Sequence, residues 1–400
     1  MQYRQDGRSG NALSILGLGC MRLPGRRGRI DLERSEPLLM EALDSGVNYL
    51  DTAYIYTGSE AAVGQILERN HARDRAYLAT KLPLMLCRAP SDFDRFLSVQ
   101  LERLRTDHID YYLMHMLTNP EQWQRLCAMG IEQWLIGKRA EGKIRQIGFS
   151  FHGRQEDFMA LVDAYDWDFC QIQYNYVNTH YQAGEAGLRY AASKGLPVIV
   201  MEPLLGGRLA TGLPERAEAA LRRAQPDWSP AAWALRWLWN QPEVTVVLSG
   251  MSAEAQLREN VAHACASLPG ELSPKALEAV VRATEAFDAS NKVPCTGCGY
   301  CMPCPQHVNI PGCFAGYNAV YAHGFSKGVQ QYMQSTGALS PLPANAGRCI
   351  KCRKCESHCP QNIPIAETMQ TVAKRMEPFW YKAGMAVARR YAAGGGLKKK

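Results

Sequence analysis

Short apolar runs alternate with amphipathic stretches along residues 1–290. Eight runs are almost continuously apolar, which is typical of strands covered on both faces. They are Leu16–Cys20, Val47–Asp51, Ala76–Thr80, Ile109–His115, Ile144–Phe149, Phe169–Gln173, Pro197–Met201 and Val244–Leu248. Helical patterns lie between most of them, at Leu32–Ser45, Glu60–Arg69, Asp92–Leu104, Pro120–Glu141, Gln155–Tyr165, Gly184–Lys194 and Pro230–Asn240. Strand–helix units in this number predict an α/β fold, a (β/α)8 TIM barrel, with a doubly wound sheet as the alternative.

Further elements flank this pattern at both ends. Tyr3 and Ala12–Ser14, separated by turn-forming glycines, predict a hairpin that closes the barrel floor. Two helical stretches, Ala253–Cys265 and Pro274–Ala289, follow the last strand. We therefore expect a barrel domain over 1–290, a cysteine-rich domain over 291–376 and a basic, poorly ordered tail over 377–400.

Eight cysteines near the carboxyl end fall in two proline-terminated runs. The first is Cys295-x2-Cys298-x2-Cys301-x2-Cys304-Pro305, and the second is Cys349-x2-Cys352-x2-Cys355-x3-Cys359-Pro360. Three thiolates at this spacing hold one side of a [4Fe–4S] cluster, and the fourth cysteine of each run ligates the other cluster in two-cluster ferredoxins. The sequence therefore predicts two clusters, one on Cys295, Cys298, Cys301 and Cys359 and the other on Cys349, Cys352, Cys355 and Cys304.

Zinc and disulfide bonds are the other uses of clustered cysteines. Zinc sites usually combine two CxxC pairs or include histidines, and disulfides suit small secreted scaffolds, so neither accounts for a doubled four-cysteine run. Cys301 and Cys304 are one residue closer together than their counterparts in the second run, which leaves Cys313 as an alternative fourth ligand. Between the runs, the stretch from Phe314 to Met333 has few β-branched residues, and a helical ferredoxin-like domain is expected.

Charge is distributed unevenly along the chain. Residues 291–400 contain 14 Lys+Arg and 3 Asp+Glu, and the chain totals of 45 and 38 leave 31 and 35 for residues 1–290. The excess positive charge either balances the two clusters or forms a docking face for an acidic redox carrier. The sequence has no apolar run of membrane-spanning length and no apolar signal-peptide core, so we expect a cytoplasmic protein without a membrane span or a nucleic-acid partner.

Four polar residues lie at or just after the ends of three neighbouring apolar runs, where a (β/α)8 barrel places its active site. Asp51 ends the second run with Tyr56 five residues later, and Lys81 and His115 lie at the ends of the third and fourth. Each has an ordinary structural explanation: a helix cap, a core tyrosine, a solvated lysine and a satisfied buried histidine. Their occurrence together on adjacent strand ends favours a catalytic group.

The segment from Gly46 to Gly64, GVNYLDTAYIYTGSEAAVG, resembles the aldo-keto reductase family. The resemblance continues with ATKLP around Lys81 and IDYYLMH up to His115, and it covers about residues 1–290. It implies a (β/α)8 barrel that reduces carbonyls with a nicotinamide, NAD(H) or NADP(H). The whole chain resembles a subgroup of that family with a C-terminal ferredoxin-like extension, most closely in the run from Cys295 to Pro305.

The resemblance implies that Tyr56 is the proton donor, that Lys81 and Asp51 tune it and that His115 orients the carbonyl. These roles agree with elementary chemistry. A free tyrosine titrates near pH 10, too high for efficient acid–base catalysis at neutral pH, and a nearby ammonium lowers that pKa. A carboxylate keeps the ammonium charged and in place, and a neutral histidine can donate to the carbonyl oxygen.

The resemblance also implies a nucleotide site formed by residues that follow the later strands. The matching residues are Ser150 and Gln171 for the carboxamide, Ser249 and Gly250 for the phosphates, and Glu259 and Asn260 for the adenine.

Other positions depart from the family pattern. Phe151 stands where an asparagine is expected, and Met201 where a tyrosine would stack on the nicotinamide. Gly250 and Gln256 replace the cations that would hold a 2′-phosphate. A buried phosphate dianion needs such cations, so we expect NADH to bind at least as readily as NADPH.

Three functions remain in competition. The favoured one is an oxidoreductase that interconverts a small carbonyl and an alcohol in the barrel and couples this reaction to two electron-transfer clusters. The alternatives are a carbonyl reductase with purely structural clusters, and an electron-transfer or ligand-sensing protein whose barrel does not turn over. Lys81 beside Tyr56 argues against the last, because a binding module does not need that pair.

Overall fold

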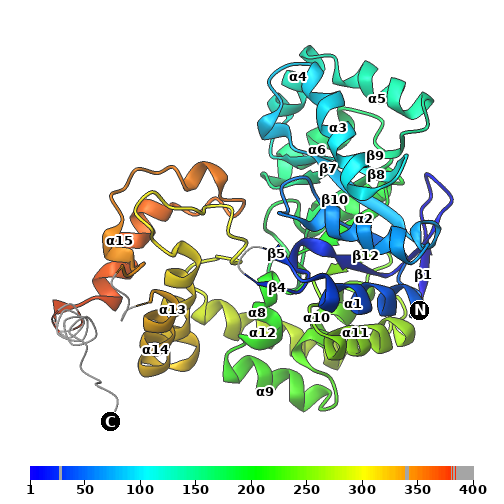
Figure 1. Cartoon of the computed structure of the whole chain (residues 1–400). Helices are drawn as coiled ribbons and strands as arrows, with labels where there is room; N and C mark the ends of the chain where they lie inside the picture. Colours follow the sequence, from blue (N-terminus) through cyan, green and yellow to red (C-terminus); the bar gives the residue numbers. More distant parts are fainter. Residues whose placement is uncertain (27–28, 338–341, 380, 382, 384–400) are drawn as a thin grey trace, which may run out of the picture. The chain divides into compact units, whose positions relative to one another are not determined.

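The computed structural model describes residues 1–26, 29–337, 342–379, 381 and 383 (Figure 1). The chain forms two compact units. The first comprises Met1–Leu204 and Ala231–Ser273, and the second comprises Leu205–Pro230 and Pro274–Lys400. The unit that contains the cysteine runs therefore also contains residues 205–230 and 274–290, which lie within the sequence-based limits of the barrel domain. Most of the predicted tail, 377–400, lies outside the described residues.

Eight parallel strands close into a barrel in the first unit, in the order β10-β11-β12-β3-β6-β7-β8-β9. All eight predicted runs form these strands, so the predicted (β/α)8 fold is confirmed. The strands are β3 (Leu16–Gly19), β6 (Tyr49–Asp51), β7 (Tyr77–Leu82), β8 (Ile109–Leu117), β9 (Ile144–Phe151), β10 (Phe169–Gln173), β11 (Val198–Met201) and β12 (Val244–Ser249).

Helices surround the barrel strands (Figure 1) and bury the main apolar core against them. They are α1 (Leu32–Asp44), α2 (Ser59–Arg69), α3 (Ser91–Leu104), α4 (Pro120–Ala128), α5 (Ile131–Ala140), α6 (Gln155–Asp163), α7 (Gly184–Ser193), α10 (Pro230–Trp239) and α11 (Glu254–Ala266). The single helix predicted over Pro120–Glu141 is wrong, because the chain breaks there into α4 and α5. Gly130 separates them with a left-handed φ of 82°, which glycine adopts without a steric penalty.

A hairpin of β1 (Tyr3–Gln5) and β2 (Ala12–Ser14) is present as predicted. Its turn reaches the barrel interior, where the Tyr111 hydroxyl donates to Asp6 at 2.7 Å and Leu13 joins the inner apolar cluster. Tyr111 lies near the amino end of β8, so the hairpin closes the floor and leaves the opposite end for chemistry. A second small hairpin pairs β4 (Gly25–Arg26) with β5 (Arg29–Ile30).

The second unit is helical and holds both cysteine runs in its loops. Its helices are α8 (Arg208–Thr211), α9 (Glu215–Ala224), α12 (Pro274–Ser290), α13 (Ile310–His323), α14 (Phe325–Ser335) and α15 (Ile365–Met376). The stretch from Phe314 to Met333 is helical, as expected, and forms parts of two helices, because Gly324 with a φ of 92° ends α13. The apolar core joins side chains of α13 and α15, such as Phe314 and Met369, to residues that flank the cysteines.

Across the described residues, no helix combines the length and apolarity that crossing a membrane requires.

Candidate active site and cluster sites

A buried ion pair joins two neighbouring barrel strands. Asp51 ends β6, and Lys81 lies near the end of β7, which pairs with β6. The Lys81 ammonium donates to both carboxylate oxygens of Asp51 and to the carbonyl of Thr52, each at 2.7 Å. The two side chains are only 1 and 6 % exposed. Burial lowers the pKa of Lys81, and the Asp51 carboxylate opposes that shift.

The other two predicted residues lie beside this pair. Tyr56 is on the turn after β6, and its ring centroid is 5.2 Å from the Lys81 ammonium. The Tyr56 ring also meets the His115 ring edge-on, with centroids 6.1 Å apart. The structure therefore brings all four residues predicted from the strand ends into one group. Tyr56 is the half-buried member, so it is the one that a bound molecule can reach most directly.

A bulge near the end of β8 presents His115. The register between β8 and β9 shifts between Met114 and Leu117, and Met116 takes a left-handed φ of 61°. The Met116 amide donates to the Ser150 hydroxyl at 2.8 Å, which fixes the bulge to β9. Such bulges redirect a side chain at the cost of local strain and are frequent beside active sites. Nδ1 of His115 is buried and has no hydrogen-bond partner among the described residues, so it can serve a ligand.

A second histidine, which sequence reasoning missed, lies close to the first. His152 follows β9 and is buried, with Nδ1 3.2 Å from the Gln182 side-chain oxygen. Burial and the positive charge of Lys81 lower the pKa of His115 well below its usual value, and burial lowers that of His152 to about 4. Both rings are therefore neutral near pH 7. His152 could have been found from the sequence, because it is a polar residue at the carboxyl end of the fifth barrel strand.

The residues predicted to hold the nicotinamide carboxamide lie next to this group. Ser150 on β9 and Gln171 on β10 are paired in register, and both are buried. The Gln171 amide donates to Asp51 at 2.8 Å, which fixes the orientation of the Gln171 side chain beside the Lys81–Asp51 pair. The orphaned His115 nitrogen and these polar side chains fit a carbonyl group and a nicotinamide.

The predicted nucleotide residues after β12 also come together. The Asn260 amide donates to the Ser249 hydroxyl at 3.2 Å, and both residues are buried. Glu259, one position earlier on α11, is half-buried. The stem of Arg22, an exposed residue after β3, passes 3.7 Å from the position that a Cβ on Gly250 would occupy. Arg22 is thus a cation at this loop that the sequence pattern did not identify.

Arg258 does not supply the cation that positions 250 and 256 lack. Arg258 on α11 is held by ion pairs to Glu41 at 2.6 Å and to Glu254 at 3.2 Å. The Gln256 side-chain oxygen accepts the Ser252 amide at 2.9 Å. Arg22 is therefore a cation whose side chain passes beside the Ser249–Gly250 loop.

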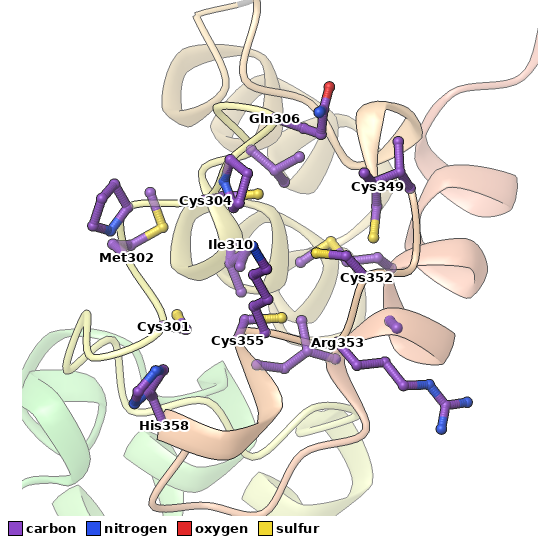
Figure 2. A pocket seen from close by; sticks show the side chains of 18 of the residues that line it. Cys301, Met302, Cys304, Gln306, Ile310, Cys349, Cys352, Arg353, Cys355 and His358 are labelled. Carbon is purple, nitrogen blue, oxygen red and sulfur yellow. The ribbon is translucent and has the colours of Figure 1, made fainter. Parts of the chain in front are cut away.

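The eight cysteines of the two runs line two cavities in the second unit. A cavity of about 350 Å³ is lined by Cys304 together with Cys349, Cys352 and Cys355 of the second run, and also by Cys301 (Figure 2). A smaller cavity of about 20 Å³ is lined by Cys295, Cys298, Cys301 and Cys359. Apart from Cys301, which lines both cavities, each cavity combines cysteines of one run with the last cysteine of the other, the arrangement predicted for cross-ligation. Four thiols around one space fit a [4Fe–4S] cluster.

The two runs share a backbone pattern that the sequence conceals. Residues two and four positions after the first cysteine have a positive φ in both runs: Gly297 and Gly299 in the first, Lys351 and Arg353 in the second. The pattern extends to the last cysteine of each run. The residue three positions after Cys304 and the residue three positions after Cys359 both have a positive φ, and both amides donate to the cysteine carbonyl at 2.9 and 3.0 Å. Cys304 is therefore the structural counterpart of Cys359.

Cys313 lies apart from both cavities. It is fully buried on α13, and its thiol is 3.7 Å from the carbonyl of Ala344. Among the described residues, no three His, Cys, Asp or Glu side chains converge closely enough to hold one metal ion. Burial raises the pKa of Cys295 to about 11 and that of Cys301 to about 12, so these thiols are protonated near pH 7 and lose a proton when they bind iron.

Comparison with known proteins agrees with this geometry. Residues 15–280 match the model of the aldo/keto reductase family, and residues 294–363 match a 4Fe-4S dicluster domain. The chain therefore belongs to the aldo/keto reductase family and is an oxidoreductase with a C-terminal iron–sulfur domain.

Individual relatives cover the barrel. A 6-dehydroglucose reductase of Novosphingobium aromaticivorans is 31 % identical over 280 residues, 64 % of this chain and 88 % of the relative. An NADH-specific methylglyoxal reductase of Escherichia coli is 26 % identical over 298 residues, 62 % of this chain and 89 % of the relative. An aldo-keto reductase from Bacillus halodurans, solved in its holo form, superposes with a TM-score of 0.58 at 26 % identity, covering 71 % of this chain and 96 % of that one.

Proposed function

We propose that the barrel interconverts a small carbonyl compound and its alcohol with NAD(H) or NADP(H), and that two [4Fe–4S] clusters exchange electrons with this reaction. The observation that carries the proposal is the buried Lys81–Asp51 pair at 2.7 Å beside the Tyr56 ring. A buried ion pair is weak support for stability, so its position next to a reachable tyrosine points to chemistry. The reductase names of the relatives agree with a small carbonyl substrate.

Tyr56 is the proton donor in this proposal. The Lys81 ammonium stabilises the phenolate that Tyr56 becomes after it protonates the nascent alkoxide. Asp51 holds Lys81 charged and in place, and Gln171 orients Asp51 through its 2.8 Å hydrogen bond. Neutral His115 donates a hydrogen bond to the carbonyl oxygen and so fixes the substrate's orientation.

The nicotinamide, when bound, supplies or accepts a hydride at the carbonyl carbon. Ser150 and Gln171 would hold its carboxamide, and Glu259 and Asn260 its adenine. The Ser249–Gly250 loop would hold the phosphates, with Arg22 as the nearby cation. The loss of cations at positions 250 and 256 supports a preference for NADH over NADPH, and so does the name of the NADH-specific relative.

The clusters, when bound, would carry one electron each, so the two together would match the two electrons that interconvert the oxidised and reduced nicotinamide, whose hydride is then the group exchanged with the carbonyl. The first would be held by Cys295, Cys298, Cys301 and Cys359, and the second by Cys304, Cys349, Cys352 and Cys355.

Replacing Tyr56 by phenylalanine tests the barrel chemistry. With a panel of small aldehydes and ketones, Tyr56→Phe should lower kcat by about 10²–10⁴-fold, because it removes a general acid. Nucleotide affinity should stay within about twofold, because the hydroxyl acts mainly in the transition state. Tyr54→Phe is the matched control, since Tyr54 lies on the same loop and packs on Phe96 and Arg103 instead. A Tyr56→Phe enzyme that keeps more than half of the wild-type rate would refute the assignment.

A further inference from the structure

The two cysteine runs share a backbone but differ in the residues that build it. The first run uses glycine at its two left-handed positions, Gly297 and Gly299. The second uses Lys351 and Arg353 there, with φ of 58° and 59°. Non-glycine residues are strained in this region, and such strain persists mainly where function requires the side chain. The first run shows that glycine suffices for the cluster loop, so the two cations serve something other than the backbone.

The outer surface of the first run is covered by the chain's own residues. Gly206 packs so closely that a Cβ there would lie 1.8 Å from the Thr296 carbonyl. Arg208 donates to the Cys295 carbonyl at 3.4 Å and stacks on Phe287. Thr296 is consequently buried, and Cys298 is half-buried.

The corresponding surface of the second run has no such cover among the described residues. Ile350, Lys351, Cys352, Arg353 and Lys354, here called the Cys352 loop, are all exposed, and Ile350 is 61 % exposed. Cys352 also lines the larger cysteine cavity, so a cluster bound there would lie close to solvent. An exposed aliphatic residue among cations next to a redox centre is a typical protein-docking pattern.

Arg353 and Lys354 both line the larger cysteine cavity, but the Arg353 charge is directed outward. Figure 2 shows the Arg353 side chain extending away from the cysteine sulfurs. Its one ion pair, to Glu367 at 3.0 Å, is exposed on both sides and therefore weak. Neither Lys351 nor Lys354 has an ion pair among the described side chains. Cations placed to neutralise thiolates would point toward the sulfurs, as Arg353 does not.

We propose that the Cys352 loop is the docking face for an acidic one-electron carrier protein. In each encounter the carrier loses one electron and the cluster held by Cys304, Cys349, Cys352 and Cys355 gains it, or the reverse, and no bond or proton is transferred. The inference rests on the proposed function in one respect, namely that these four cysteines bind a cluster. The interface is expected to be small and transient, as in other electron-transfer complexes.

The rate of electron transfer between this protein and an acidic plant-type [2Fe–2S] ferredoxin, measured by stopped flow, tests the proposal. The reaction is followed in the direction in which electron transfer is energetically favourable. The key variant is Lys351→Gly with Arg353→Gly, which removes two charges and gives the second run the glycines of the first. At about 10 mM ionic strength the second-order rate constant should fall at least about tenfold. The rate constant of the wild-type protein should decrease toward that of the variant as salt is added, because salt screens the attraction between opposite charges. Iron content should be unchanged, and the thermal midpoint unchanged or higher, since the left-handed backbone then suits its residues.

Lys327→Glu is the matched control, because it alters net charge equally at an exposed position on α14. It should leave the rate within about twofold, whereas an equal fall would assign the effect to net charge and overturn the proposal. A double-glycine variant that exchanges electrons at the wild-type rate, or that loses iron, would also overturn it. The proposal would also be overturned if the only property that the double-glycine variant loses is binding to anionic lipid vesicles. Two assays on the same samples test the proposed function separately. Photoreduction by a deazaflavin reports whether the clusters accept electrons, and nicotinamide-dependent carbonyl reduction reports whether the barrel is active.

Discussion

The Asp51→Asn variant probes the central ion pair through the pH dependence of stability. In the wild-type protein Lys81 donates to both Asp51 oxygens and to the Thr52 carbonyl, with 1 % of its side chain exposed. The substitution leaves a buried ammonium with neutral acceptors only. Removing one partner of a buried pair typically costs about 3–5 kcal/mol.

Deprotonation of Lys81 limits this penalty. From a reference pKa of about 10.4, neutralising a lysine costs about 4.6 kcal/mol at pH 7 and about 1.9 kcal/mol at pH 9. Burial already lowers the folded-state pKa of Lys81, and loss of the carboxylate lowers it further. At a pH between the pKa of Lys81 in the folded state and its pKa in the unfolded state, the unfolded chain binds more protons than the folded chain. The stability of the folded state therefore rises with pH in this range. The stability difference between the variant and the wild type should therefore shrink from pH 7 to pH 9.

Urea unfolding followed by tryptophan fluorescence measures this effect. Asp110→Asn is the control, because Asp110 is also buried but pairs with Arg73 at 2.8 Å and Arg145 at 3.1 Å. A guanidinium does not deprotonate in this range, so that variant should lose stability without recovering it at pH 9. An Asp51→Asn protein whose deficit is the same at both pH values would show that Lys81 keeps its charge without Asp51, which contradicts the reasoning.

Three further outcomes are expected. Anaerobically prepared protein should hold about eight irons; Cys304→Ser should lose about half of them and Cys313→Ser none, and the reverse pattern would reassign the fourth ligand. Fluorescence titration should show NADH binding at least as tightly as NADPH, with Arg22→Gln weakening both; NADPH binding more than tenfold tighter, about 1.4 kcal/mol, would require a cation not recognised here. Because the pKa of His115 is well below its usual value, kcat/KM should show no inflection between pH 6 and pH 8, and one that disappears in His115→Gln would refute the neutral-histidine assignment.

The elements of the barrel were predictable because strands covered on both faces are continuously apolar. Phe169–Gln173 was predicted with the observed limits, and the other strands differ by a few residues at their ends. Helix interruptions were harder to place, since Gly130 and Gly324 lie within patterns that continue on both sides. Helix α9 was missed although its apolar and charged residues follow a helical period; it buries only Ala217 and Leu221.

The site was predictable as far as it depends on strand ends and cysteine spacing. Asp51, Lys81 and His115 follow from the rule that barrel strands present their carboxyl ends to the active site. Tertiary contacts between distant segments had no such signal. The hydrogen bond from Gln171 to Asp51 joins residues 120 positions apart, and Arg22 approaches Gly250 across an even longer separation. The packing of Gly206 on Thr296 likewise appears only when the chain is folded.

Cluster spectroscopy before and after addition of NADH tests the central claim most directly. Protein purified anaerobically and oxidised should hold two diamagnetic clusters, and NADH should produce the paramagnetic signal of reduced [4Fe–4S] centres. Since one hydride carries two electrons and each cluster accepts one, about one NADH should reduce both clusters of one chain. Clusters that stay oxidised while the same sample reduces carbonyls with NADH would show that the barrel and the clusters are not coupled, and would contradict the account.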